Sequence, residues 1–237
     1  MTVSAPESAD RMRFPGVRAP KPLLSHEAER QLSARQLEVL DELEAQLLHD
    51  GLADLTMAEI AAGVGCSLRT LYGIAPSKDE LLLTIVDRRL HRIGRAAIQS
   101  LDSSMLPLSA LRAYLQAANE AVQPEAVAMS ADLAKVAGAG RLFDAHEGYL
   151  VAVTQSLLDR AVSQGHIAPL DSASVAHVLG GLGREFARPE VAAIADASPK
   201  ETADAISELI LQGLLATRCE TGEARGAEPG DNVQEAS

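Results

Sequence analysis

Residues 55–83 decide the fold, and they read LTMAEIAAGVGCSLRTLYGIAPSKDELLL. Two short segments with helical spacing of apolar residues lie in this stretch, and a hydroxyl residue precedes each of them. Thr56, followed three residues later by Glu59, has the spacing of a capping box and predicts a helix over 57–63. Ser67 predicts the start of a second short helix after a tight turn that contains glycine. Two short helices joined by such a turn indicate a helix-turn-helix unit.

The flanking sequence supports this unit on both sides. Leucines at helical spacing predict one helix over 27–49, and Gly51 can adopt the left-handed conformation that ends it. After the break at Pro76, Ser77 predicts the start of a longer helix that continues to about residue 101. The sequence therefore predicts one helix before the helix-turn-helix unit and one longer helix after it.

The composition predicts an all-α chain with an aliphatic core. Hydrophobic residues make up 47 % of the sequence, aromatic residues only 3 %, and tryptophan is absent. Alanine, leucine and glutamate favour helices, whereas runs of β-branched and aromatic residues are scarce. The formal charge of -12 favours solubility and does not favour broad contact with nucleic acid, so DNA binding would depend on local placement of basic groups.

The second short helix would enter the major groove of DNA by its N-terminal residues. The residues at that position are Ser67, Leu68, Arg69 and Thr70. An arginine can bind O6 and N7 of guanine in a bidentate manner, and a threonine can contact a thymine methyl group or a phosphate. Two short helices with a glycine turn also occur in bundles that bind nothing, so the spacing alone leaves that alternative open.

The whole stretch resembles the N-terminal pattern of TetR/AcrR-type transcriptional regulators. The matching groups are Leu55-Thr56, Ile60-Ala61, Gly65-Cys66-Ser67, Thr70-Leu71-Tyr72 and Ser77-Lys78-Asp79-Glu80-Leu81. The resemblance implies about nine helices, of which three bind DNA and the others form a divergent ligand-binding and dimerisation domain. It also implies a repressor that a ligand releases from a palindromic operator.

Carried over to this sequence, the resemblance places Thr56, Tyr72 and Lys78 at backbone phosphates. It places Ser67, Arg69 and Thr70 on the face of the second short helix that meets DNA. Thr56 and Ser67 would serve equally as helix caps, Tyr72 as partly buried core and Lys78 as a solvated charge.

The chain departs from the family pattern at Ile74 and Ala75, where a phosphate donor and an aromatic residue are usual. Residues 30–95 carry eight basic and ten acidic side chains, a net charge of about 8 − 10 = −2. These features support an alternative function: a TetR-like helical dimer with weakened or lost DNA binding that acts as a ligand-sensing or protein-interaction adaptor.

The sequence divides into four regions. Residues 1–27 are rich in proline and charge and are expected to form a disordered arm, or alternatively an arm that enters the minor groove. Residues 28–76 form the expected helix-turn-helix domain, and residues 77–218 the expected helical ligand-binding and dimerisation domain. The polar residues 219–237 are expected to be disordered.

Proline and glycine divide the second region into further helices over about 108–122, 124–137, 141–164, 172–187 and 199–217. By resemblance, the last two helices pair with their symmetry mates in a homodimer. Three glycines in 180–183 predict close packing of the helix over 172–187. An apolar effector would bind among the preceding helices, and the candidate residues are Met105, Tyr114, Met129, Phe143, His146 and Tyr149.

The sequence offers little support for an enzyme, a metalloprotein or a membrane protein. The six histidines have no metalloprotease spacing, no nucleophile or phosphate-binding motif occurs, and the two cysteines lie far apart. We therefore expect no enzymatic activity, no cofactor and no metal site. The sequence has no signal-peptide pattern and no uncharged run of about 20 residues, which predicts a cytoplasmic protein.

Overall fold

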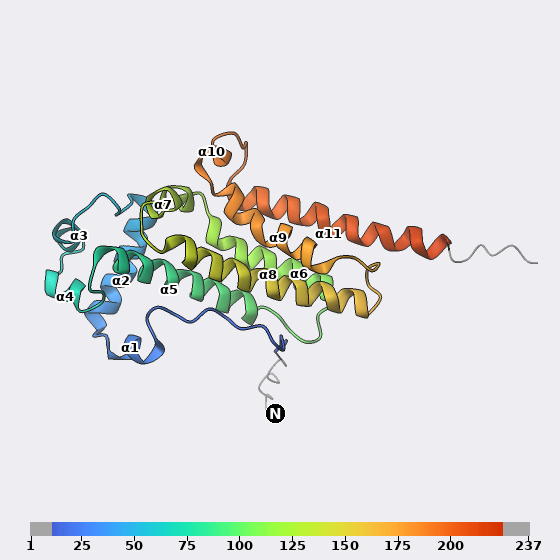
Figure 1. Cartoon of the computed structure of the whole chain (residues 1–237), viewed down its shortest axis with the longest axis horizontal. Coiled ribbons are helices and arrows are strands. Elements are labelled where there is room, and N and C mark those ends of the chain that lie inside the picture. The colour runs from blue at the N-terminus through green and yellow to red at the C-terminus, as the bar shows by residue number, and fades with distance from the viewer. Residues whose placement is uncertain (1–10, 225–237) are drawn as a thin grey trace, which may run out of the picture.

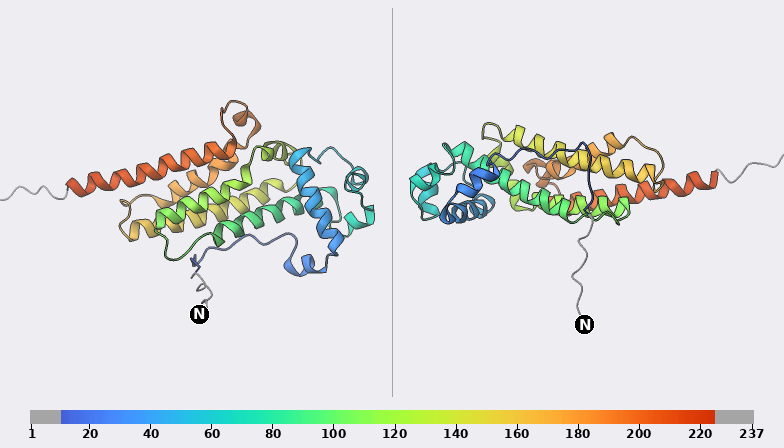
Figure 2. Two further views of the ribbon diagram at one scale, coloured as in Figure 1. Left: turned by 180° about the vertical axis from the view of Figure 1, so that it is seen from behind. Right: turned by 90° about the horizontal axis from the view of Figure 1, so that it is seen from below.

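The computed structural model describes residues 11–224, apart from the side chains of residues 126, 128, 131 and 217–224. The described part is all-α, as predicted, and its elongated body carries the helix-turn-helix unit at one end (Figure 1). The long helices run roughly along the axis of the body, and the last one continues past its far end (Figure 2). The elements in chain order are α1 His26–Gln31, α2 Ala34–His49, α3 Met57–Gly63, α4 Leu68–Tyr72, α5 Lys78–Gln99, α6 Pro107–Ala118, the 3₁₀ helix η1 Asn119–Val122, α7 Glu125–Leu133, α8 Ala139–Ser163, α9 Ser172–Phe186, α10 Pro189–Ala192 and α11 Pro199–Ala224.

The predicted helix caps are present in the structure. The Thr56 hydroxyl accepts a hydrogen bond from the Glu59 amide, and the Glu59 carboxylate accepts one from the Thr56 amide, which completes a capping box. Ser67 and Ser77 cap α4 and α5 in the same way, each through the amide three residues later. Local sequence chemistry therefore fixes where α3, α4 and α5 begin.

The helix predicted over 27–49 is instead two helices. Ser33 forms a capping box with Gln36, so α2 starts at Ala34 and the chain turns between α1 and α2. The leucine periodicity continues across this turn, which is why spacing alone suggested a single helix. The sequence also did not predict α10, which is a helix of a single turn.

Two apolar clusters form the core. The first lies under α2, α3, α4 and the start of α5, and it also takes in Met129 and Leu133 of α7. The second lies between the rest of α5 and the helices α6, α8, α9 and α11. Because α5 contributes to both clusters, it links the helix-turn-helix unit to the body.

Part of the segment that was expected to be a disordered arm is ordered in the structure. Residues 11–25 lie along the body, whereas residues 1–10 fall outside the described part. Met12 is buried, and Phe14 and Val17 pack against the second cluster. Arg11 forms an isolated antiparallel bridge with Asp102, far from α4 (Figure 1). Apolar side chains scattered among prolines fix this segment without any helical spacing, so residues 11–25 are not a minor-groove arm in this structure.

Polar contacts also join the helix-turn-helix unit to the body. Glu44 of α2 is buried and forms ion pairs with Arg89 and Arg92 of α5. The Asp132 carboxylate of α7 accepts hydrogen bonds from the amides of Leu52 and Ala53, at 3.0 and 3.2 Å. The loop that leads into α3 is therefore held by a residue of the body.

The C-terminal boundary also differs slightly from the prediction. The helix expected to end at about residue 217 continues to Ala224, and residues 225–237 fall outside the described part. Among the helices of residues 11–224, none is both long enough and apolar enough to cross a membrane.

Candidate functional site

One face of α4 is exposed at the tip of the molecule (Figure 1). Leu68 and Tyr72 are 42 % and 54 % exposed, large fractions for apolar and aromatic side chains. Arg69 is exposed, and its guanidinium group has no hydrogen bond or ion pair within residues 11–224. Leu71 points the other way and is fully buried. The helix is therefore anchored on one face, while three side chains of the other face are free to meet a partner.

The hydroxyl groups of this surface already have partners. The Thr56 hydroxyl donates a hydrogen bond to the Glu59 carboxylate at 2.7 Å. The hydrogen bond from the Thr56 amide and this one from its hydroxyl lower the pKa of Glu59. The hydroxyls of Ser67 and Thr70 lie 2.9 Å apart, and Ser67 also accepts from the Thr70 amide. Both Ser67 and Thr56 are exposed, so capping and phosphate contact are compatible at these positions.

The ammonium group of Lys78 is hydrogen-bonded within the protein. It donates to the carbonyls of Ala53 and Leu55, the latter at 3.0 Å. The loop before α3 is thus held by Lys78 of α5 as well as by Asp132 of α7. A phosphate contact from Lys78 would have to share the ammonium group with these carbonyls.

The departure from the family pattern at Ile74 and Ala75 leaves the turn anchored. Ala75 is only 3 % exposed, and Ile74 is half-buried against the first apolar cluster. The amides of both residues donate to the carbonyl of Leu71, at 2.9 and 3.0 Å. A small residue and an aliphatic residue therefore fix the end of α4 without an aromatic ring.

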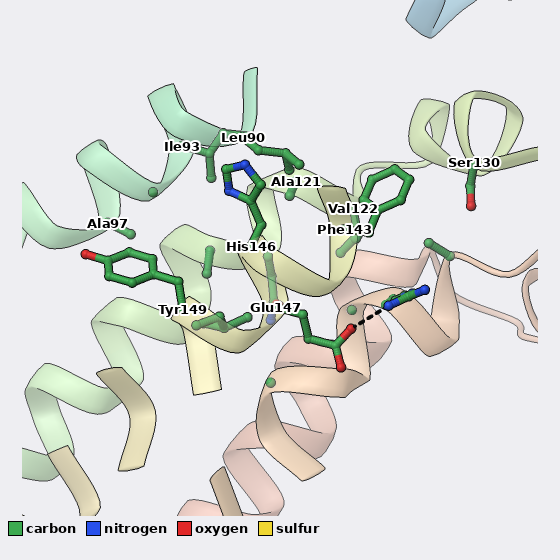
Figure 3. A pocket seen from close by; sticks show the side chains of 18 of the residues that line it. Leu90, Ile93, Ala97, Ala121, Val122, Ser130, Phe143, His146, Glu147 and Tyr149 are labelled. Atoms are coloured by element: carbon green, nitrogen blue, oxygen red, sulfur yellow. Dashed lines mark hydrogen bonds and ion pairs between the residues drawn. The ribbon is translucent and has the colours of Figure 1, made fainter. Parts of the chain in front are cut away.

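A cavity of about 170 Å³ lies in the body of the protein. Its walls come from α5, α6, η1, α7, α8 and α9, and apolar side chains form most of them (Figure 3). Five of the six predicted effector-binding residues line it: Tyr114, Met129, Phe143, His146 and Tyr149. Met105 does not. It lies in the loop before α6, where its sulfur accepts a hydrogen bond from the Asp102 amide at 3.4 Å.

Sequence reasoning missed most of the polar groups of the cavity. Asn119, Glu147 and Arg184 also line it. Arg184 of α9 forms ion pairs with Glu147 and Asp144 of α8, at 3.0 and 2.6 Å, and Figure 3 shows the first of these at the cavity wall. Charged residues on amphipathic helices normally face water, so no local sequence signal separates these from solvated charges.

Two tyrosine hydroxyls provide further polar groups. Tyr114 is 2 % exposed and Tyr149 is half-buried. Burial raises the pKa of both phenols, and Tyr149 adds to the effect on Tyr114. Both therefore stay neutral at physiological pH, and neither has a hydrogen-bond partner within the described residues.

The glycines of α9 have the role that the sequence predicted. A Cβ atom on Gly180 would lie 2.6 Å from a methyl carbon of Val151 in α8, so α8 and α9 are in close contact there. A Cβ atom on Gly183 would lie 3.3 Å from Val122 of η1. Both glycines border the cavity and set the separation of its walls.

The outer face of α11 carries an exposed apolar stripe. Ala205, Leu209, Gly213 and Ala216 recur at helical spacing and are all exposed, Leu209 by 67 %. Val178 on neighbouring α9 is 53 % exposed. An exposed apolar surface of this kind is typical of a protein–protein interface.

No protein-family model and no curated protein sequence matches the chain. Solved structures do. The TetR family regulator PfmR from Thermus thermophilus is 25 % identical with a TM-score of 0.53, over 74 % of this chain and 98 % of PfmR. The chain has a TetR-like fold.

Two further structures agree. A TetR transcription regulator from Haloarcula marismortui has a TM-score of 0.63 at 19 % identity, over 76 % of this chain and 97 % of its own. A Saccharomonospora viridis protein, described as a transcriptional regulator and solved in complex with choline, has a TM-score of 0.61 at 15 % identity over 75 % and 95 %. The TetR-like resemblance read from residues 55–81 is confirmed at the level of the fold, and the neighbours are regulators rather than enzymes.

Proposed function

We propose that this chain is a ligand-responsive transcriptional regulator, in its simplest form a repressor, that binds a palindromic operator as a homodimer. The observation that carries the proposal is the exposed face of α4, where Leu68, Arg69 and Tyr72 are presented on a firmly capped helix. Only Arg69 offers a free guanidinium there, which suits bidentate recognition of guanine. Thr56, Ser67, Thr70 and Lys78 would add contacts to the phosphate backbone and bases.

The dimer follows from the requirements of the operator and from the apolar face of α9 and α11. A palindromic site needs two reading helices about 34–36 Å apart, which a single chain does not supply. The apolar stripe on α11 and Val178 would meet their counterparts in a second copy of the chain. Small residues at Ala205 and Gly213 would allow the paired helices to approach closely.

The effector would be a small, largely apolar molecule with one or two polar groups. The apolar walls supply the binding energy, while the unpartnered hydroxyls of Tyr114 and Tyr149 would orient the ligand. The choline bound by the Saccharomonospora viridis neighbour supports a small-molecule occupant in this fold.

A route from the cavity to α3 is present in α7. Met129 and Ser130 line the cavity, and Asp132 of the same helix holds the amides of Leu52 and Ala53. A ligand that displaces α7 would move the loop into α3, and with it the reading helix. Operator release would follow from a differential affinity of the effector for the two arrangements.

The effector site is testable by filling it. A Cβ atom at Gly94 of α5 meets no atom within 4 Å, and the residue borders the cavity. We expect Gly94→Leu to occupy the space and to weaken binding of the apolar probe 1-anilinonaphthalene-8-sulfonate at least about tenfold. Helix propensity favours leucine over glycine by up to about 1 kcal/mol, so the fold should be retained.

The matched control for this experiment is Gly148→Leu. Gly148 lies on α8, is exposed, and its Cβ position is equally open, but it does not line the cavity. Probe fluorescence should be unchanged in this variant. Equal binding by wild type and Gly94→Leu would place the probe elsewhere and would argue against the cavity as the effector site.

The alternative, an adaptor with weakened or lost DNA binding, rests on the same surface. The region over 30–95 has a net charge of about −2, and Lys78 is occupied by backbone carbonyls. The two functions are separated by sequencing the genomic fragments that bind the purified protein. Enrichment of a palindrome supports the regulator, and the absence of any enriched sequence at low salt supports the adaptor.

A further inference from the structure

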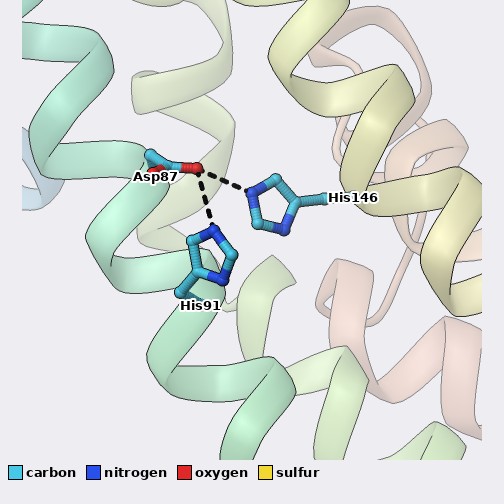
Figure 4. Close-up of side chains that lie close together, drawn as sticks. All are labelled: Asp87, His91 and His146. Atoms are coloured by element: carbon cyan, nitrogen blue, oxygen red, sulfur yellow. Dashed lines mark hydrogen bonds and ion pairs between the residues drawn. The ribbon is translucent and has the colours of Figure 1, made fainter. Parts of the chain in front are cut away.

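A buried cluster of two histidines and one aspartate lies between α5 and α8, beside the effector cavity (Figure 4). Asp87 and His91 are four residues apart on α5 and therefore share one face of the helix. His146 reaches the same point from α8. The side chains of Asp87, His91 and His146 are 3 %, 12 % and 12 % exposed.

The geometry concentrates three metal-binding atoms. The Nε2 atoms of His146 and His91 lie 2.9 and 3.5 Å from the same Asp87 oxygen, Oδ1. All three ligand atoms lie within 4.8 Å of one another. In a tetrahedral zinc site, bond lengths of about 2.0–2.2 Å place neighbouring ligand atoms roughly 3.3 Å apart. The observed distances bracket this value, and small rotations of the imidazole rings would complete the match.

One of these atoms, His91 Nε2, is buried and makes no hydrogen bond within the described residues. It lies 3.5 Å from Asp87 Oδ1, an ion-pair distance without a hydrogen bond, and buried polar atoms are nearly always hydrogen-bonded or bound to another group. The two rings meet edge to face at a centroid distance of 4.8 Å, and a nitrogen of each ring points toward Asp87 (Figure 4).

The surroundings supply an outer shell and room for a fourth ligand. Asp87 Oδ2 accepts a hydrogen bond from the Leu23 amide at 2.7 Å, which leaves Oδ1 for the histidine side. Hydrogen bonds of this kind orient metal-binding carboxylates. A second cavity of about 20 Å³ borders Asp87 and His91 but not His146, and its walls also include His26, Glu29, Arg88 and Arg95. This volume is enough for one water molecule.

We propose that Asp87, His91 and His146 bind one divalent transition-metal ion of the Zn²⁺ class, with water in the fourth position. Two imidazoles and one carboxylate form a ligand set that suits this class and leaves an open coordination site. The ion would join α5, α8 and, through Leu23, the segment over 11–25. The proposal is independent of DNA binding, although His146 also lines the effector cavity.

The direct test is to measure Zn²⁺ binding to the untagged full chain by isothermal titration calorimetry. We expect one ion per chain in the wild type and at least about tenfold weaker binding in His91→Ala and in His146→Ala, since even outer-shell changes have effects of this size. His177→Ala is the matched control, because His177 is an exposed histidine on α9 outside the cluster. Gly94→Leu should keep the ion, which separates this site from the effector site.

A second measurement, the visible absorption of bound Co²⁺, uses the wild type alone. Co²⁺ bound to the wild type should give the visible d–d absorption of nitrogen and oxygen ligation without a thiolate charge-transfer band, which excludes binding through Cys66 or Cys219. Absence of stoichiometric binding, a thiolate band, or unchanged affinity in the folded double variant His91→Ala/His146→Ala would each overturn the proposal.

Discussion

Replacing Arg69 with alanine is expected to lower operator affinity more than any other single change on the surface of α4. The Arg69 guanidinium is exposed and has no partner within residues 11–224, so nothing in the free protein depends on it. Loss of a bidentate guanine contact costs about 1–3 kcal/mol. Two copies per dimer give about 2–6 kcal/mol, roughly a 30-fold to more than 10⁴-fold loss at 25 °C. Fluorescence anisotropy titration of the operator measures this loss.

Arg160→Ala provides the control for charge alone. Arg160 lies near the C-terminal end of α8, at the opposite end of the body from α4 (Figure 1). This substitution removes the same charge without touching the proposed reading surface. If both variants bind the operator as tightly as the wild type, Arg69 does not read DNA and α4 has been assigned wrongly.

Introducing a charge into the apolar stripe on α11 is expected to separate the dimer. Leu209 is 67 % exposed in the single chain and would be buried against its counterpart. Leu209→Asp removes about 1.5–3 kcal/mol of apolar burial per chain and places two carboxylates in the interface. A loss above about 4 kcal/mol corresponds to a dissociation constant for the dimer that rises about 10³-fold or more. Sedimentation velocity over a range of concentrations measures the shift, and operator affinity should fall with it.

Leu106→Asp is the matched substitution outside this face. Leu106 is 60 % exposed and precedes α6, so the same change in charge and volume should leave the dimer intact. A wild-type chain that sediments as a monomer at micromolar concentration would contradict the proposed interface. So would a Leu209→Asp variant that still sediments as a dimer.

The helix-turn-helix unit could be predicted closely because its chemistry is local. Thr56, Ser67 and Ser77 each bond an amide three residues later, and such caps are readable from spacing. The break before α2 had an equally local signal, Ser33 with Gln36, but the continuous leucine pattern concealed it. Five residues that line the cavity were predicted as candidates because they are large side chains on the helices that enclose it.

The remaining features depend on contacts between distant parts of the chain. Packing of Met12, Phe14 and Val17 against helices that are distant in the sequence orders the segment over 11–25. No periodic pattern of apolar residues in this segment predicts that packing. The Asp87–His91 pair is visible as a helical i, i+4 spacing, but His146 lies 59 residues from Asp87. Histidine spacing along the sequence therefore does not reveal that α5 and α8 bring these three side chains together.

The proposed function depends on the exposed face of α4, which we propose reads DNA. The most direct measurement is enrichment of genomic fragments by purified wild type and Arg69→Ala in parallel at low salt, with sequencing of the bound DNA. We expect the wild type to enrich a palindromic sequence with half-sites about one helical turn apart, and the variant to lose that sequence. Failure of the wild type to enrich any sequence, or enrichment of the same palindrome to the same extent by Arg69→Ala, would contradict this proposal.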